Sequence, residues 1–299
     1  MKPAPFRYLR PTSLEDALAA LHQATSETGP NGDEFASDQV KVLAGGQSLV
    51  PLLSMRLTQP ELLIDLNAVT GLNRIARDGD DLRVGAMTRH ERLVDDPVIA
   101  AQVPLLTQAA THIGHRAIRT RGTLGGSLAH ADPAAELPLV ALALEAEIEL
   151  ASLSGTRRVP ASAFFEGPLS TCVGADELIV AVRFPLATAR RPFGFAELAR
   201  RHGDFALALA AVTVAVDADG VCRAATVAVG GVAGTPLLLG AAARVLLGTR
   251  LEDGAVDAAA QAVTAHINPH GDLHASAGYR RAMSQLLVRR AIQSARGAQ

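Results

Sequence analysis

The sequence has no tryptophan, and aromatic residues make up only 3% of its 299 positions. A site that holds its ligand between stacked aromatic side chains is therefore not expected, and binding is left to backbone and aliphatic groups. Cysteine occurs only twice, as Cys172 and Cys222, and no CxxC spacing is present. Neither a zinc knuckle nor an iron–sulfur cluster can be built from this chain alone, so any such cluster must belong to another polypeptide.

The sequence also has no large excess of charge of one sign and no long apolar run. The 28 basic and 30 acidic side chains give a formal net charge of -2 with no long block of one sign, so nucleic acid is not an expected partner. No run of about 18 apolar residues occurs, and the N-terminus lacks the apolar core of a signal peptide. We expect no transmembrane segment and a cytoplasmic location. A hydrophobic content of 48% is enough for two compact domains.

Local patterns predict a mixture of helices and strands. Residues Thr12 to Glu15 have the form of a capping box, and leucines then recur at helical spacing, which predicts a first helix. The polar stretch 26–38 is expected to form a loop before a buried strand at 40–44. Strands and helices are expected to alternate thereafter. Further strands are predicted at 62–66, 82–84, 178–185, 206–216 and 224–229, further helices at 104–114, 241–247 and 279–295, and a linker at 186–192.

Two glycine pairs stand beside these elements, Gly45–Gly46 in AGGQS and Gly125–Gly126 in TLGGS. Glycine permits positive φ and close approach of the backbone to a ligand, so the N–H groups of both pairs can converge on phosphate oxygens. Hydroxyl groups of Ser48, Thr123 and Ser127 would add donors. Alone, such a pair more often marks a tight turn. GxGxxG and the P-loop are absent, which disfavours a Rossmann domain and a kinase-like site, and GGQSL is not the GxSxG of a serine hydrolase.

The two regions together are more specific than either pair. Segments 44–57 (AGGQSLVPLLSMRL) and 113–138 (IGHRAIRTRGTLGGSLAHADPAAELP) closely resemble the two flavin-binding signatures of the FAD subunit in the xanthine oxidase and carbon monoxide dehydrogenase family of molybdenum hydroxylases. Supporting similarity in segments 6–17, 195–206 and 277–290 extends the resemblance over almost the whole chain.

The resemblance implies an α+β protein. Residues 1–187 are expected to form an FAD-binding domain with the PCMH/vanillyl-alcohol-oxidase-like fold, made of two α/β subdomains at about 1–60 and 61–187. Residues 192–299 are expected to form a C-terminal α+β domain of the carbon monoxide dehydrogenase flavoprotein type.

The resemblance also implies which residues contact FAD. The first signature, which wraps the diphosphate in the family, maps onto Val42, Leu43, Ala44, Gly45, Gly46, Gln47, Ser48 and Leu49. The second, which supplies a phosphate and ribityl cradle, maps onto Thr123, Gly125, Gly126 and Ser127. Ile113 matches the position of an apolar group that lies against the flavin region. Glu136 matches the position of an acidic residue near the cofactor, and Leu178 matches that of an aliphatic contact to the isoalloxazine ring.

Asp132 is a candidate N-cap for a helix beginning at Pro133, which is a structural role that needs no ligand. It is also counted among the residues expected near the cofactor.

Two departures from the family pattern stand out. Ser127 replaces an asparagine or aspartate, and residues 195–198 contain no lysine where several relatives have one near the flavin, which leaves the tuning of the flavin open.

Histidines and arginines before the second glycine pair admit other interpretations. His112 and His115 have the i,i+3 spacing of a metal site, but no third ligand is evident, so hydrogen-bonding or solvent-facing roles are favoured. Arg116, Arg119 and Arg121 can neutralise phosphate, face a partner subunit or lie at a solvated surface. No metal ligand and no catalytic side chain is predicted.

In the family, this type of subunit passes electrons from an iron–sulfur small subunit and a molybdopterin-binding large subunit, through FAD, to an external acceptor. The resemblance therefore implies FAD in this chain, molybdopterin and 2Fe-2S clusters only in the partners, and a dimer of heterotrimers. Two rival hypotheses are a free-standing flavin oxidase, which would turn over a small molecule by itself, and a flavin-free scaffold subunit that keeps the fold.

Overall fold

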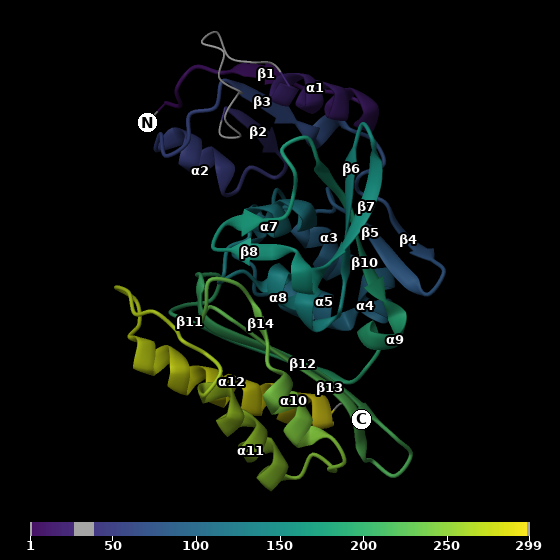
Figure 1. Ribbon diagram of the computed structural model, residues 1–299, viewed down its shortest axis with the longest axis vertical. Helices are drawn as coiled ribbons and strands as arrows, with labels where there is room; N and C mark the ends of the chain where they lie inside the picture. The colour runs from purple at the N-terminus through teal and green to yellow at the C-terminus, as the bar shows by residue number, and fades with distance from the viewer. Residues whose placement is uncertain (1, 27–38, 298–299) are drawn as a thin grey trace.

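Three layered units follow one another along the chain in the computed structural model, which describes residues 2–26 and 39–297. They are stacked along the long axis of the molecule, with the N-terminal unit at one end and the C-terminal unit at the other (Figure 1). The loop predicted at 26–38 lies, apart from its first residue, outside the described residues.

The first subdomain is a parallel sheet with the strand order β1-β3-β2. Its elements are β1 (Arg7–Leu9), α1 (Leu14–Ser26), β2 (Val40–Leu43), α2 (Leu49–Ser54), β3 (Leu62–Asp65) and the 3-10 turn η1 (Leu66–Ala68). Helix α1 forms as predicted, but its cap lies one residue later, because the Asp16 amide donates to Ser13 Oγ at 3.0 Å. Strand β2 is half-buried rather than buried, because it lies at the end of the described strand order.

Strand β3 lies between β1 and β2 and is buried along its whole length. The predicted subdomain boundary near residue 60 would cut this central strand away from its neighbours, so that boundary is wrong. The first subdomain continues to η1.

The second subdomain contains an antiparallel sheet with the order β4-β5-β10-β6-β7. These strands are β4 (Ile75–Asp78), β5 (Asp81–Gly85), β6 (Glu147–Ser152), β7 (Gly155–Pro160) and β10 (Leu178–Pro185), and β8 (Phe165–Gly167) pairs with β9 (Ser170–Thr171) beyond η2 (Ala161–Ala163). The helices between β5 and β6 are α3 (His90–Asp95), α4 (Pro97–Gln102), α5 (Pro104–Ala110), α6 (Arg116–Arg119), α7 (Leu124–His130) and α8 (Glu136–Ala143). The predicted alternation of strands and helices fails here, because these helices follow one another directly.

Two helix boundaries in this run differ from prediction. Helix α5 begins at Pro104 but ends at Ala110 instead of Gly114, which has a φ of +46° in a separate turn. Helix α8 begins at Glu136 and not at Pro133, because Asp132 instead accepts the Ala134 amide at 2.8 Å and closes a short turn before the helix.

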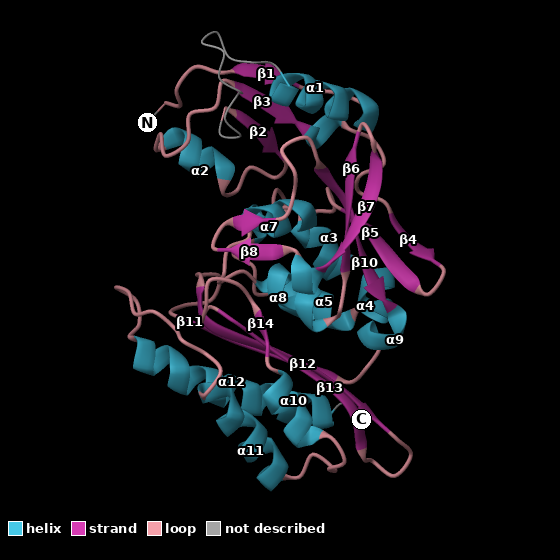
Figure 2. Ribbon diagram, viewed as in Figure 1, coloured by secondary structure: helices cyan, strands magenta, loops and turns pink. Residues whose placement is uncertain are grey.

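The C-terminal unit is an antiparallel sheet with helices against one face (Figure 2). Its elements are β11 (Phe193–Ala199), β12 (Ala206–Val216), β13 (Cys222–Gly230), β14 (Leu237–Leu238), α10 (Gly240–Leu246), α11 (Asp253–Thr264) and α12 (Ala277–Gly297). The β12–β13 hairpin around Asp217 is confirmed, whereas β11 and α11 were not predicted. The predicted linker is wrong in part, since α9 (Leu186–Ala189) is helical and largely buried.

Strand β12 shows why this sheet lies between two layers of helices. Its side chains alternate between two cores: Leu209 and Ala211 pack in the core that contains α8, while Ala210 and Val212 face the C-terminal helices. The pattern has the period of two expected for a strand, but both faces are apolar because both are covered. The C-terminal unit and the second subdomain therefore share one continuous core.

Candidate cofactor site

The two loops that carry the glycine pairs, far apart in the sequence, come into direct contact between the first and second subdomains. A Cβ atom added at Gly45 would overlap the carbonyl oxygen of Arg121 and lie 2.7 Å from Gly122 Cα. A Cβ atom added at Gly126 would lie 3.4 Å from Ala44 Cβ. The two signatures therefore form one site.

The first loop, residues 44–48, carries backbone N–H groups with no acceptor among the described residues. The amides of Gly45, Gly46, Gln47 and Ser48 donate no hydrogen bond to any part of the chain that the structure describes. Gly46 has a φ of +74°, and left-handed residues of this kind occur in the backbone concavities that bind anions. Unpaired amides at one turn suit the oxygens of a diphosphate.

The second loop, residues 121–127, uses its N–H groups within the protein. The amides from Leu124 to Ser127 each donate to an oxygen of Thr88, Ala86 or Thr123, at 2.7–3.1 Å. These amides join α7 to its cap and to the residues after β5, so unpaired N–H groups are found in the first loop and not in the second. The contact of Gly125 and Gly126 with FAD stays a prediction. The half-buried Ser127 hydroxyl can still donate, whereas Thr123 is 1% exposed and its Oγ1 accepts the Gly126 amide.

Contacts within the protein explain the glycines themselves. Gly45 allows the first loop to touch the backbone of the second, and a Cβ atom at Gly125 would lie 2.6 Å from Ala86 Cβ. The close approach expected for a ligand is thus made in part by protein atoms at these two positions.

The apolar residues of the first signature support its loop. Val42 and Ala44 pack against the core of the first subdomain, and Leu43 lies beside Gly46. Leu49 is half-buried at the start of α2. Their contact with FAD stays a prediction.

Ile113 lies on a turn held by groups from two directions. Arg119 donates to the carbonyl oxygens of Ile113 and Gly114, at 3.3 and 3.4 Å. From the C-terminal unit, Gly203 approaches so closely that a Cβ atom there would lie 2.8 Å from Gly114 O. This turn fixes the half-buried Ile113 side chain, which packs partly against the core of the second subdomain.

Glu136 belongs to a group of buried titratable side chains between the second subdomain and the C-terminal unit. Burial raises the pKa of Glu136 to about 7, and burial, with the Glu136 carboxyl nearby, raises the pKa of Glu197 to about 8. His112 Nδ1 lies 3.7 Å from Glu197 Oε2, which is longer than a hydrogen bond, and burial lowers the pKa of this histidine. At neutral pH the Glu197–His112 pair is therefore largely uncharged.

Leu178 and Asp132 do not lie in the two loops. The Leu178 side chain is 3% exposed and packs in the core shared by α1, β3 and β10. Asp132 is half-buried beside Glu136 and adds to the rise of that residue's pKa. Whether either side chain touches FAD stays a prediction.

His112 and His115, whose spacing was considered for a metal site and disfavoured, make ring contacts with different partners. The His112 ring packs on Phe195, whereas the His115 ring stacks on His202. Among the described residues, no group of three or more histidine, cysteine, aspartate or glutamate side chains could hold a metal ion.

The basic cluster before the second loop is divided in the structure. Arg116 and Arg119 both form ion pairs with Glu91, at 2.9 Å. Arg121 instead places its carbonyl oxygen against the first loop.

Two further residues at the junction were missed. Asn67 Nδ2 donates to the carbonyl oxygen of Ala44 at 2.8 Å, and Arg89 Nη1 donates to the carbonyl oxygen of Arg121. No local sequence signal marks them, because each acts on a loop that is distant along the chain.

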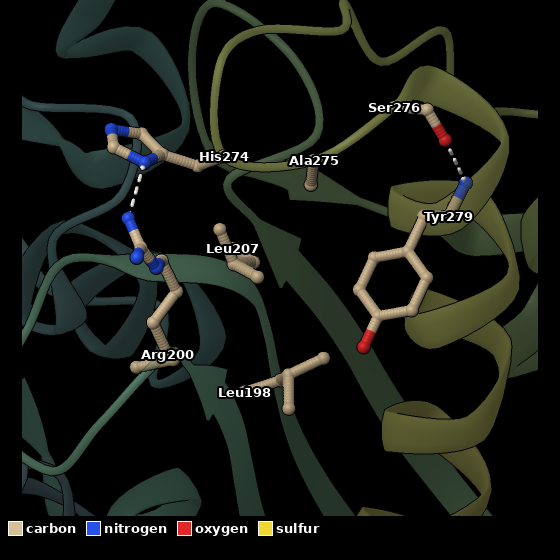
Figure 3. Close-up of a pocket in the computed structure, with 8 residues that line it drawn as sticks. Leu198, Arg200, Leu207, His274, Ala275, Ser276 and Tyr279 are labelled. Atoms are coloured by element: carbon tan, nitrogen blue, oxygen red, sulfur yellow. Dashed lines mark hydrogen bonds between the residues drawn. The ribbon is translucent and has the colours of Figure 1, made fainter.

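A separate hollow of about 560 Å³ lies on the C-terminal unit between β11, β12 and the start of α12 (Figure 3). Arg200 and His274 are in contact at its edge, 3.1 Å apart, and Tyr279 lies across from Leu198 and Leu207. It shares no lining residue with the two glycine loops.

Comparison with known families covers nearly the whole chain. Residues 4–187 match the FAD binding domain in molybdopterin dehydrogenase, and residues 193–295 match the CO dehydrogenase flavoprotein C-terminal domain. The chain belongs to the FAD-binding medium subunits of the molybdenum hydroxylase family. This medium subunit is thus part of an oxidoreductase, its cofactor is FAD, and the α+β fold predicted from the resemblance is confirmed.

Relatives of this medium subunit are similar over their full length. The nicotine 6-hydroxylase medium subunit of Paenarthrobacter nicotinovorans is 41% identical over 297 residues, 99% of each chain. The carbon monoxide dehydrogenase medium chain of Afipia carboxidovorans is 34% identical over 296 residues, 99% of this chain and 98% of its own. The crystal structure of quinoline 2-oxidoreductase from Pseudomonas putida 86 matches with a TM-score of 0.91 at 36% identity, covering 100% of this chain and 99% of that one.

As for membrane association, none of this medium subunit's helices, within the described ranges, combines the length and apolar character needed to cross a bilayer.

Proposed function

We propose that this medium subunit is an electron carrier, whose FAD accepts electrons from iron–sulfur clusters in a partner and passes them to an external acceptor. The observation that carries the proposal is the set of unpaired first-loop amides in a chain whose two cysteines, Cys172 and Cys222, cannot form a cluster. Any iron–sulfur cluster that reduces the flavin must therefore belong to another polypeptide.

The proposed partners are an iron–sulfur small subunit with 2Fe-2S clusters and a molybdopterin-binding large subunit, in a dimer of heterotrimers in the cytoplasm. The names of the relatives support the presence of partner subunits, since two of them are designated a medium subunit and a medium chain. The substrate is then chosen by the large subunit and not by this chain.

Within the site, the first loop is proposed to bind the FAD diphosphate with the amides of residues 45–48. Thr123 and Ser127 of the second loop, with Ile113 and Glu136, are proposed as further contacts to FAD. The isoalloxazine ring supplies the redox chemistry, and the protein holds and orients it. No side chain is required to act as a nucleophile or a general acid.

The proposal is tested by direct electron transfer under anaerobic conditions. The iron–sulfur partner is photoreduced and mixed with the oxidised FAD-loaded chain, while the visible absorbance of the flavin is followed. We expect the flavin to bleach as the clusters reoxidise. Flavin that stays oxidised beside reduced clusters would contradict the proposal.

The two rival functions predict different results in the same anaerobic experiment. A free-standing oxidase would bleach its flavin with nicotine, quinoline or carbon monoxide in the absence of any partner, whereas we expect no bleaching. A scaffold subunit would bind its partners but retain no FAD.

A further inference from the structure

The side chain of Asn67 holds the first loop from the side of the first subdomain. Its Nδ2 donates to the carbonyl oxygen of Ala44 at 2.8 Å. The same amide group and the Asn67 backbone N–H also donate to Asp65, a carboxylate that is 5% exposed. Asp65 also accepts a hydrogen bond from the Tyr8 hydroxyl. Because Asp65 is buried and also bonded to Tyr8, its hydrogen bond with Asn67 holds the Asn67 side chain in one orientation.

Arg89 connects this asparagine to the second loop. It lies just before α3 in the second subdomain, and its Nη2 donates to Asn67 Oδ1 at 2.6 Å. Its Nη1 donates to the carbonyl oxygen of Arg121. The planar guanidinium can reach both acceptors at once, which the single ammonium of a lysine cannot do with the same geometry. A continuous chain of hydrogen bonds therefore runs from Ala44 to Arg121.

Two arginines and one buried carboxylate, Asp65, contribute the charge at this junction. Among the residues that the structure describes, no carboxylate forms an ion pair with Arg89 or Arg121. Burial lowers the pKa of Arg89, and the neighbouring Arg121 cation lowers it further. The buried Asp65 carboxylate acts on Arg89 in the opposite direction, so it offsets part of the positive charge of the two arginines.

We propose that Asn67 and Arg89 form a clasp that sets the spacing of the first and second loops and thereby the affinity for FAD. Both are positioning residues, since each acts through a loop carbonyl and not through the flavin. The clasp joins the two subdomains at the site, because Asn67 belongs to one and Arg89 to the other. This inference rests on the proposed binding of FAD by the first loop.

The test is a double-mutant cycle measured on FAD binding. Dissociation constants are determined for the full chain and for Asn67→Ala, Arg89→Ala and the double variant, by fluorescence quenching and by the visible circular dichroism of the bound flavin. Each single variant is expected to weaken binding about tenfold, because an anchored hydrogen bond is lost. The double variant is expected to bind about as weakly as the weaker single, because either change opens the same chain of bonds.

Single variants that bind within about twofold of the unaltered chain, or effects that multiply in the double variant, would overturn the clasp. Arg89→Lys separates geometry from charge. It is expected to bind as weakly as Arg89→Ala, and full affinity in Arg89→Lys would show that charge alone matters.

Arg116→Ala is the matched control. Arg116 is a cation close to the second loop, but its side chain is 78% exposed and pairs with Glu91. Its removal is expected to leave FAD affinity unchanged, and a loss equal to that of Arg89→Ala would assign the effect to general electrostatics. Urea unfolding checks that each variant is folded. Should Asn67→Ala fail to fold, Asn67→Ser replaces it in the cycle.

Gly46→Val and the milder Gly46→Ala separate the clasp from the proposed site. If both Gly46 variants keep full FAD affinity, the first loop does not bind the cofactor, and the proposed clasp is contradicted as well. If they lose affinity while the clasp variants do not, the site stands and only the clasp is wrong.

Discussion

Glu136 and Glu197 bring two carboxyl groups into the interior where the FAD-binding domain meets the C-terminal domain. The Glu197 side chain is 4% exposed, and its Oε2 has no hydrogen-bond partner among the described residues. A buried carboxyl in this position is more stable with its proton bound, which is why both pKa values lie above the usual range. Protonation at this contact should therefore affect the stability of the whole chain.

We predict that the chain becomes less stable as the pH rises from about 5.5 to about 8.5, in part through Glu197. A group whose pKa is raised in the folded state contributes stability below its unfolded pKa, and this contribution is lost as the pH rises toward about 8. Glu197→Gln removes the titration, so its free energy of unfolding should change with pH by about 2 kcal/mol less than that of the unaltered chain over this range.

Urea unfolding at several pH values measures this difference. The Glu136 carboxyl and the His112 imidazole also face Glu197, so Glu136→Gln and His112→Gln serve as comparisons. A Glu197→Gln profile parallel to that of the unaltered chain would show that Glu197 does not titrate between these limits.

At this scale, the sequence predicts the glycine loops but not the side chains that hold them. AGGQS and TLGGS are visible because only glycine fits such turns and contacts. Asn67 and Arg89 are not visible, because their roles arise from contacts across 22 and 32 residues of chain. The internal use of the second-loop amides likewise depends on Thr88 and Ala86, which lie outside the signature.

Among the elements, strand β11 and helix α12 touch backbone to backbone in the C-terminal unit. A Cβ atom at Gly194 would overlap the carbonyl oxygen of Ala291 and lie 2.9 Å from its Cα. The helix can therefore lie this close to the sheet only while residue 194 has no side chain.

We predict that Gly194→Ala lowers the free energy of unfolding by about 2–3 kcal/mol, because the added methyl group forces α12 away from β11. Gly254→Ala is the matched control, since a Cβ atom there meets nothing within 4 Å in helix α11. That variant should raise stability by up to about 1 kcal/mol. Equal effects at the two positions, measured by urea unfolding, would mean that the contact with α12 is not tight.

Prediction at the element scale depended on how strongly each segment was patterned. The β12–β13 hairpin has long apolar strands and an Asp-Gly turn, so it was predicted correctly. Strand β11 contains a glycine and a glutamate and has no strict alternation, and α11 is rich in small residues, so neither gave a clear signal. The segment of helix α9 was predicted as a linker because the two arginines and the proline that follow it are typical of a linker, and its own apolar turn is short.

Over the whole molecule, the C-terminal unit completes the region around the second subdomain. Its sheet lies on α5 and α8, and its residues Gly203 and Glu197 reach the Ile113 turn and Glu136. The division into an FAD-binding domain and a C-terminal domain therefore describes two folding patterns around a shared core, not two independent bodies. The resemblance predicted both patterns, but spacing alone could not predict this contact.

Hydrogen–deuterium exchange of the chain with and without FAD tests the central claim most directly. The amides of Gly45, Gly46, Gln47 and Ser48 should exchange rapidly in the free protein and become protected when FAD binds. The amides from Leu124 to Ser127 should be protected in both states, because they already donate to protein oxygens. If FAD leaves the first loop unprotected, or protects the second loop instead, the first loop does not bind the diphosphate.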